Sequence, residues 1–254
     1  MKLKTTLAAV AALALTAAIN TSCSTPEQGR SLRIMTYDVH NGLGCDKIHS
    51  YDRPADVIKQ HQPDVVALQE MDSVTARYSD YVLGELAERT GMYSYYGPAF
   101  DYAGGKYGVG ILSTKPALSI QQHALDCPSE PRTILIAEFE DYYFGSTHLS
   151  MVAEERMEAI KRIREIAATL DKPFFFAGDL NAEPDSPEIQ ELKAFTTILT
   201  PTDTPTWNAD ADTPTTCIDY IVCSGTDEVK VREASVIMEL KAADHRPLLV
   251  DLEF

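Results

Sequence analysis

The chain has 254 residues, of which 44% are hydrophobic and 24% charged, and its formal net charge is −16. These values exclude a largely disordered chain and suit a single α/β domain with a sizeable core. The negative charge disfavours extended contact with nucleic acid, because each phosphate contact requires Lys or Arg.

The first residues predict a targeting segment. Lys2 and Lys4 precede an apolar stretch that is too short to span a membrane comfortably, and small residues then lead to Cys23. This arrangement resembles a bacterial lipoprotein signal, in which residues 1–22 are removed, Cys23 is lipidated and residues 23–31 form a tether. The expected location is the periplasm or cell surface, anchored to a membrane. An ordinary secretory signal with an incidental Cys is the alternative. Cleavage removes two lysines and no acid, so the net charge of −16 becomes −18.

Several apolar runs predict buried strands, and most of them end in or contain an acid or a His. These runs span residues 32–38, 65–70, 145–149, 174–179, 218–222 and 248–252. After the fourth run, Asp179 and Asn181 stand two apart, so both side chains project to the same side of an extended chain. A strand end capped by an Asx turn is the alternative interpretation. Because buried, unpaired acids are costly, convergence on one metal site explains all of these residues together.

The remaining segments predict a scaffold of helices and strands. We expect helices over residues 52–61 and 81–90, and a surface helix whose apolar face runs through residues 157–170. Residues 133–139 alternate as a strand does. The Thr- and Pro-rich loop over residues 200–216 carries the only Trp, Trp207, which either contacts substrate or covers a sheet edge.

Four cysteines follow the predicted leader: Cys45, Cys127, Cys217 and Cys223. Export would permit disulfides, and free, partly buried thiols are the alternative. Cys217 and Cys223 flank one predicted strand, about 20 Å apart when extended, which makes them poor partners for each other. A zinc site is not predicted, because no pair has the close spacing typical of zinc ligands.

In order and spacing, the motifs of residues 32–254 resemble the endonuclease/exonuclease/phosphatase superfamily, the DNase I-like metal-dependent phosphohydrolases. The matching motifs are Tyr37-Asp38-Val39-His40-Asn41-Gly42, Leu68-Gln69-Glu70, Tyr107-Gly108-Val109-Gly110, Pro131-Arg132, Thr147-His148-Leu149, Gly178-Asp179-Leu180-Asn181, Ile218-Asp219-Tyr220-Ile221 and Asp244-His245. The resemblance implies an α/β four-layer sandwich of two mostly antiparallel β-sheets, packed face to face and flanked by helices. The order of strands and helices alone does not separate this fold from a parallel sheet.

The resemblance also implies a site for Mg²⁺ or Mn²⁺. Glu70 is the expected ligand, with Asp38 and Asp244 in or near the same shell, since carboxylate oxygens suit hard divalent ions. Asp38 departs from the family, which usually has Asn at this position. The additional negative charge changes metal affinity or the pKa of neighbouring carboxylates.

Catalytic roles follow from the same resemblance. Asp179 would orient or deprotonate the attacking water, and Asn181 would hold a phosphate oxygen. His245, held by Asp219, would pair with phosphate or act as the acid–base group, and His148 would donate to a phosphoryl oxygen.

Other residues are expected at the margin of the site. Arg132 would support it, and Tyr107 would either border the phosphate or pack at the start of a strand. His40 and Asn41 would enter the rim of the cleft. The other histidines are expected on the surface.

The function predicted from these motifs is an exported, metal-dependent phosphoesterase that hydrolyses a phosphodiester or a phosphomonoester by attack of activated water. A small-molecule, sugar-phosphate or lipid phosphoester is the expected substrate, and a monomer the expected state. A nuclease of the same superfamily is one alternative, which the acidity of the chain disfavours. A catalytically silent surface lipoprotein is another. A calcineurin-like phosphoesterase is disfavoured, because its Asp-x-His and Gly-Asn-His-Glu segments do not accompany Gly178-Asp179.

Overall fold

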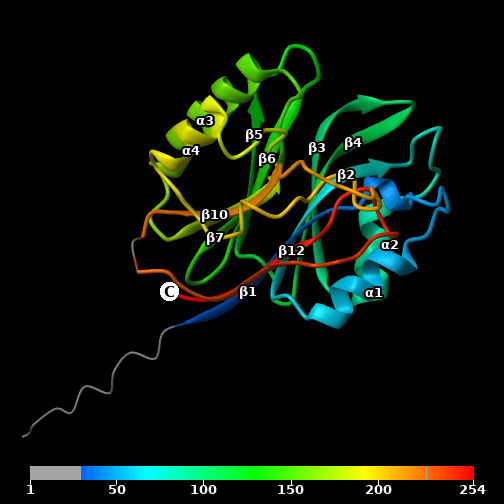
Figure 1. Cartoon of the computed structure of the whole chain (residues 1–254), viewed down its shortest axis with the longest axis horizontal. Helices are drawn as coiled ribbons and strands as arrows, with labels where there is room; N and C mark the ends of the chain where they lie inside the picture. Colours follow the sequence, from blue (N-terminus) through cyan, green and yellow to red (C-terminus); the bar gives the residue numbers. More distant parts are fainter. Residues whose placement is uncertain (1–29, 227) are drawn as a thin grey trace, which may run out of the picture.

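The computed structural model describes residues 30–226 and 228–254 and consists of two six-stranded sheets packed face to face (Figure 1). The predicted signal peptide, Cys23 and most of the predicted tether lie outside the described residues. Helices α1 and α2 flank one side of the sandwich, and α3 and α4 flank the other. The expected four-layer arrangement is therefore confirmed.

The first sheet has the strand order β11-β12-β1-β2-β4-β3. Its strands are β1 (Ser31–Asp38), β2 (Val65–Ser73), β3 (Tyr93–Tyr102), β4 (Gly105–Ser113), β11 (Lys230–Val236) and β12 (Leu248–Glu253). The second sheet has the order β5-β6-β7-β8-β10-β9. Its strands are β5 (Ser119–Leu125), β6 (Arg132–Glu138), β7 (Tyr143–His148), β8 (Phe174–Asp179), β9 (Thr197–Ile198) and β10 (Asp219–Ser224).

Two parallel pairs, β1–β2 and β7–β8, lie near the middle of the two sheets, and the other strand pairs of the described residues are antiparallel. In each parallel pair the carboxyl ends fall together: Asp38 pairs with Gln69, and His148 pairs with Asp179. Since β10 runs antiparallel to β8, its first residue, Asp219, pairs with Asp179. The topology thus brings these polar strand ends to one edge of the sandwich.

Three apolar clusters hold the layers together. One lies between the sheets and includes Ile34, Ile111, Phe175 and Val250. The second packs α3 and α4 on the outer face of the second sheet, and the third packs α1 and α2 on the first sheet. Their side chains are almost completely buried, so this packing is the main source of stability.

Three helices lie close to the ranges that the sequence predicts: α1 (Asp52–His61), α2 (Val82–Thr90) and α3 (Ala153–Ala167). Two others, α4 (Pro187–Lys193) and the short 3-10 helix η1 (His40–Gly42), were not predicted. α2 ends at Gly91, which has a left-handed conformation. Asp52 is the first residue of α1. Leu170 packs on the second-sheet core beyond the end of α3.

Two further findings bear on the sequence predictions. The four cysteines in the described part of the chain are free thiols, so the disulfide alternative is not supported. Within the same residues, no helix combines the length and the apolar character that crossing a membrane requires.

The close approach of β7 and β8 at Gly178 leads to a prediction. A Cβ at Gly178 would lie 1.8 Å from the carbonyl oxygen of Thr147, and the backbone φ is +155°. Gly178→Ala must therefore force the strands apart, and we expect a loss of about 3 kcal/mol in the free energy of unfolding, from overpacking and backbone strain. Denaturant unfolding measures this loss.

Gly104→Ala is the control. Gly104 has φ +85°, and a Cβ there would meet nothing within 4 Å. This change should cost only about 1–2 kcal/mol, from the left-handed backbone alone. Equal losses in the two variants would contradict the role assigned to the strand contact.

Candidate active site

Backbone strain is concentrated at the polar edge of the sandwich. Nine non-glycine residues of the described chain have positive φ, and four of them, His40, Asn41, Glu70 and Asn181, belong to motifs predicted from sequence to form the site. Glu70 lies in a bulge where the register between β2 and β4 shifts. Such conformations cost free energy and cluster at functional sites, where they aim a side chain that a regular strand would direct elsewhere.

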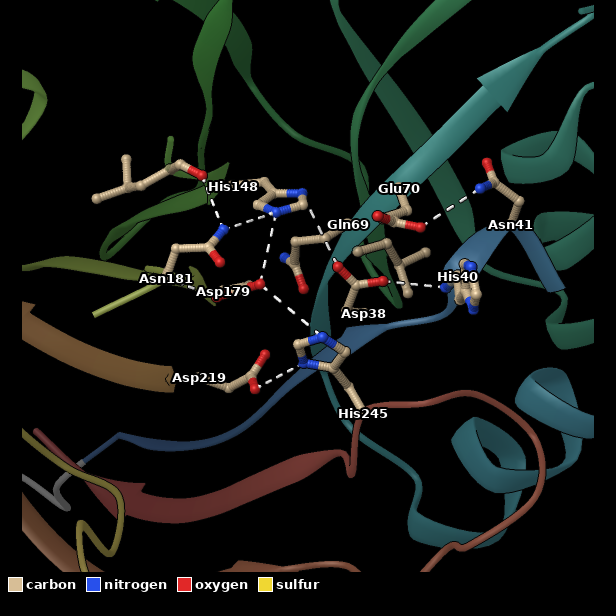
Figure 2. A network of polar contacts seen from close by, with 12 residues as sticks. Asp38, His40, Asn41, Gln69, Glu70, His148, Asp179, Asn181, Asp219 and His245 are labelled. Carbon is tan, nitrogen blue, oxygen red and sulfur yellow. Dashed lines mark hydrogen bonds and ion pairs between the residues drawn. The ribbon is translucent and has the colours of Figure 1, made fainter. Parts of the chain in front are cut away.

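Asp179 lies at the end of β8, and its two carboxylate oxygens have different surroundings. Its Oδ1 accepts a hydrogen bond from the backbone N–H of Asn181 at 2.7 Å. Its Oδ2 lies 3.5 Å from Nε2 of His148 and 3.9 Å from Nε2 of His245. Figure 2 shows the three side chains pointing toward one another. Burial, followed by the negative charge of Asp219, raises the pKa of Asp179 to about 7.

His245 and Asp219 form the pair that the family resemblance implies. Nδ1 of His245 lies 2.9 Å from Oδ2 of Asp219, and both residues are buried. Burial alone would lower the pKa of His245, but the charge and hydrogen bond of Asp219, with the charges of Asp38 and Asp179, raise it well above its ordinary value. His245 is therefore a cation at neutral pH, held in one orientation.

His148 has the opposite character. Burial, then the positive charges of Arg132 and His245, lower the pKa of His148 well below its ordinary value, so it is neutral. Asn181 donates its side-chain N–H to the carbonyl of Leu149 at 3.0 Å, and the same amide nitrogen lies 3.1 Å from Nε2 of His148. An imidazole that accepts at Nε2 carries its proton on Nδ1. That atom lies 3.8 Å from Oδ2 of Asp38.

The predicted metal ligands lie beside this cluster. Asp38 accepts from the backbone N–H of His40 at 3.0 Å, and Asn41 donates to Glu70 at 3.4 Å. Asp244 lies 3.3 Å from Nδ1 of His40. Burial and the charge of Glu70 raise the pKa of Asp38. Burial also raises the pKa of Glu70, although His40 opposes it. The negative charge of Asp244 raises the pKa of Glu70 further.

The residues present fit a divalent cation. Oδ2 of Asp38 and Oδ1 of Asn41 are buried acceptors that no donor of the described residues satisfies. Buried oxygens without donors are suitable ligands for a hard cation. Asp38, His148 and Asp179 also have ligand atoms within 4.8 Å of one another. Asp38 thus belongs both to this group and to the set predicted from sequence with Glu70 and Asp244.

A cleft of about 520 Å³ opens over these side chains. Glu70, His148, Asp179, Asn181, Asp244 and His245 line it, which brings six predicted site residues to one surface. Asp219 lies behind His245. Tyr107 and Arg132 also line the cleft, and Arg132 is only 7% exposed, with Nη2 2.8 Å from Glu130. Trp207 lines the cleft and is 42% exposed, so it does not serve only to cover a sheet edge.

Sequence reasoning missed part of the cleft. Arg77, Phe100, Tyr102, Glu130 and Met151 line it without belonging to any motif. They lie in loops or near the turn of the β3–β4 hairpin, where no periodic pattern marks them. Asn41, expected at the rim, is instead only 1% exposed. In the sequence, the only indication that Asn41 belongs to the site was its position in the short Val-His-Asn-Gly run after β1.

Comparisons with known proteins agree with this fold. A family model described as the Endonuclease/Exonuclease/phosphatase family matches residues 35–245. No curated protein matches the chain. An endonuclease/exonuclease/phosphatase from Beutenbergia cavernae has a TM-score of 0.74 and 23% identity, over 89% of this chain and 72% of that one. A mannosyl-6-phosphatase from Bacteroides thetaiotaomicron has a TM-score of 0.72 and 17% identity, and the match covers 88% of this chain and 100% of that one. Truncated Caenorhabditis elegans TDP2 has a TM-score of 0.68 and 19% identity, and the match covers 88% of this chain and 98% of that one.

Because Asp38 is buried, we predict that replacing its carboxylate with a neutral amide stabilises the metal-free protein. Because the pKa of Asp38 is raised in the fold, the folded chain binds this proton more tightly than the unfolded chain. The free energy of unfolding therefore falls as the pH rises from the unfolded pKa of about 4 toward the folded value. In chelator at pH 8, Asp38→Asn should raise Tm by at least about 2–4 °C, which corresponds to roughly 1 kcal/mol in a domain of this size.

Thermal unfolding at several pH values measures this difference, which should shrink as the pH is lowered toward about 4. Asp185→Asn, at an exposed position, is the matched control. A Tm at pH 8 that is equal in Asp38→Asn and wild type would show that the fold already neutralises the Asp38 carboxylate.

Proposed function

Since the chain belongs to the endonuclease/exonuclease/phosphatase family, we propose that it is an exported, divalent-metal-dependent hydrolase of phosphate esters that acts by attack of water on phosphorus. The observation that carries the proposal is the position of Asp179 Oδ2 between Nε2 of His148, at 3.5 Å, and Nε2 of His245, at 3.9 Å. One carboxylate between two imidazoles at a cleft suits proton transfer and stabilisation of a developing charge.

Asp179 acts as the general base or orients the attacking water. The backbone of Asn181 fixes Oδ1, which leaves Oδ2 to accept a proton. A pKa of about 7 places this carboxyl near the pH at which a general base combines an adequate ionised fraction with sufficient basicity. Burial, the largest cause of the raised pKa, thereby contributes directly to function.

The two histidines have different protonation states and therefore different roles. His245 is protonated, and Asp219 fixes its Nδ1, so Nε2–H is directed away from the dyad toward Asp179 and the cleft. It pairs with a phosphoryl oxygen or protonates the leaving group. His148 is neutral and lines the cleft, where it donates to a phosphoryl oxygen as negative charge develops.

Asp38, Glu70 and Asp244 would hold Mg²⁺ or Mn²⁺, with Asn41 offering a further oxygen. When bound, such a cation neutralises charge on the phosphoryl group and polarises phosphorus for attack. The support for this assignment is the pair of unpartnered buried oxygens on Asp38 and Asn41, together with the predominance of oxygen donors. Asp38 offers a full negative charge where the family usually supplies an amide.

A small phosphoester fits the cleft better than a nucleic acid. Five acids line it, Glu70, Glu130, Asp179, Glu183 and Asp244, against two arginines and two histidines. The chain as a whole carries −16. Both features oppose a polyanion. We therefore propose a sugar-phosphate, lipid or other small phosphoester as substrate, for a monomeric enzyme held at a membrane by lipid on Cys23. One of the structural neighbours is a mannosyl-6-phosphatase.

Metal removal tests the proposed chemistry. Hydrolysis of p-nitrophenyl phosphate or of bis-p-nitrophenyl phosphate should stop in EDTA and return with Mg²⁺ or Mn²⁺, because the cation supplies charge neutralisation. With the metal restored, Asp179→Asn and His245→Ala should lower kcat by about 10² or more, the usual contribution of a general acid or base.

Asp185→Asn, at an exposed position, is the matched control and should keep wild-type kcat. Hydrolysis that is unaffected by chelation would contradict metal dependence. Near-normal kcat in folded Asp179→Asn and His245→Ala would contradict the roles given to these side chains.

Cell fractionation tests the proposed location. Wild-type protein should sediment with membranes, whereas Cys23→Ser should be found uncleaved or released. Firm anchoring requires two lipid signals, because one acyl chain gives only marginal binding. Metabolic labelling with a fatty acid should therefore mark the wild type alone. Wild-type protein found soluble outside the cytoplasm and without label would contradict the anchor.

A further inference from the structure

One wall of the cleft contains an arginine whose position is fixed. Arg77 lies in the loop after β2, and its Nε and Nη2 donate to the two carboxylate oxygens of Asp72 at 2.7 and 2.9 Å. The Asp72 side chain is fully buried and also accepts from Thr75 at 2.7 Å. A bidentate pair of this kind holds the guanidinium plane rigidly. Among the described residues, no acceptor binds its third nitrogen, Nη1, although Arg77 lines the cleft and its side chain is 38% exposed.

Aromatic rings surround this guanidinium. Its central carbon lies 4.9 Å from the ring centroid of Tyr102 and 5.8 Å from that of Tyr107. Phe100 packs against both tyrosines, with centroid distances of 6.0 and 5.3 Å. All three rings line the cleft, and Tyr102 remains 37% exposed. These four residues, Arg77, Phe100, Tyr102 and Tyr107, are called the aromatic wall below.

The aromatic wall takes no part in the proposed proton transfers, so it is available to hold the rest of the substrate. A rigid apolar face with one fixed cation suits a small ring with both apolar and polar edges. Two acids at the same cleft, half-buried Glu130 and exposed Glu183, offer carboxylate oxygens that accept hydrogen bonds from hydroxyl groups. The same acids repel a second phosphate or a polyanionic chain.

We infer that the aromatic wall is the subsite for the leaving group and that it binds a hydroxylated ring, so that the substrate is a sugar or inositol phosphate. This inference rests on the proposed function and narrows it. The ring's apolar face packs on Tyr102 and Phe100, the fixed guanidinium of Arg77 donates to ring oxygens, and the carboxylates accept from hydroxyl groups. A hydroxylated ring occurs in free sugar phosphates and in inositol lipid headgroups, and the experiment separates these sources.

Phosphate release with Mg²⁺ tests the inference on three monoesters. These are mannose 6-phosphate, glycerol 3-phosphate and phosphatidylinositol 4-phosphate in phosphatidylcholine vesicles. Wild type should have a kcat/KM at least about tenfold higher for one of the two ring substrates than for glycerol 3-phosphate, which lacks a ring. Release from mannose 6-phosphate identifies a free sugar phosphate, and release from vesicles alone identifies a lipid headgroup.

Tyr102→Ala and Arg77→Lys should remove most of this ring preference, chiefly through a higher KM, because the aromatic wall binds ground state and transition state alike. Arg77→Lys keeps a positive charge beside Asp72 but loses the rigid fork. Tyr102→Phe keeps the ring and should retain the preference. Arg156→Ala is the matched control: Nε and Nη2 of Arg156 both donate to one oxygen, Oε1, of buried Glu188 outside the cleft, at 3.0 and 2.7 Å. It should leave the ratio of the two kcat/KM values unchanged.

A wild-type enzyme that hydrolyses glycerol 3-phosphate as well as either ring substrate would overturn the inference, and so would a ring preference that survives in folded Tyr102→Ala and Arg77→Lys. In both cases phosphate release continues, so the proposed function stands. No release from any phosphate ester in the presence of Mg²⁺ would instead overturn the proposed function, and this inference with it.

Discussion

The site depends on how the fold compensates the negative charge that it buries at the polar edge of the sandwich. Asp38, Asp179 and Asp219 are each no more than 3% exposed. A buried carboxylate costs several kcal/mol unless hydrogen bonds or opposite charges compensate it. His245 supplies the charge beside Asp219, and backbone N–H groups bind Asp179 and Asp38. The compensation is incomplete, since Oδ2 of Asp38 has no donor among the described residues. Such residual cost is expected where acids are retained for chemistry rather than for stability.

Topology decides which charged groups meet. The parallel pairs β1–β2 and β7–β8 contact each other across the sandwich, and their carboxyl ends deliver Asp38 and Glu70 from one sheet and His148 and Asp179 from the other. His245 arrives from the last part of the chain, because β12 inserts between β1 and β11. The site therefore forms only when residues from both ends of the chain are in place, which ties its geometry to the folding of the whole domain.

The sequence was sufficient to locate the strand ends, because apolar runs that stop at an acid or a His have few stable alternatives. It was also sufficient to pair Asp219 with His245, once the family resemblance was seen. The sequence could not predict how the strands pair. β1 lies between β2, which begins at residue 65, and β12, which begins at residue 248, and only long-range contacts select these parallel and antiparallel partners. The bulge at Glu70 and the left-handed backbone of Asn41 were equally hidden, since both depend on tertiary contacts that override local preference.

The division of the cleft into two parts explains why a shared fold does not identify the substrate. The charged groups stand on strand ends that the sandwich fixes, and proteins with TM-scores near 0.7 share this sandwich. The aromatic wall is different, because Arg77 comes from a loop and Phe100 and Tyr102 from the tip of the β3–β4 hairpin. Such segments change without disturbing the core. The proposed reaction type therefore rests on the residues at the strand ends, whereas the proposed leaving group rests on the aromatic wall of this particular chain.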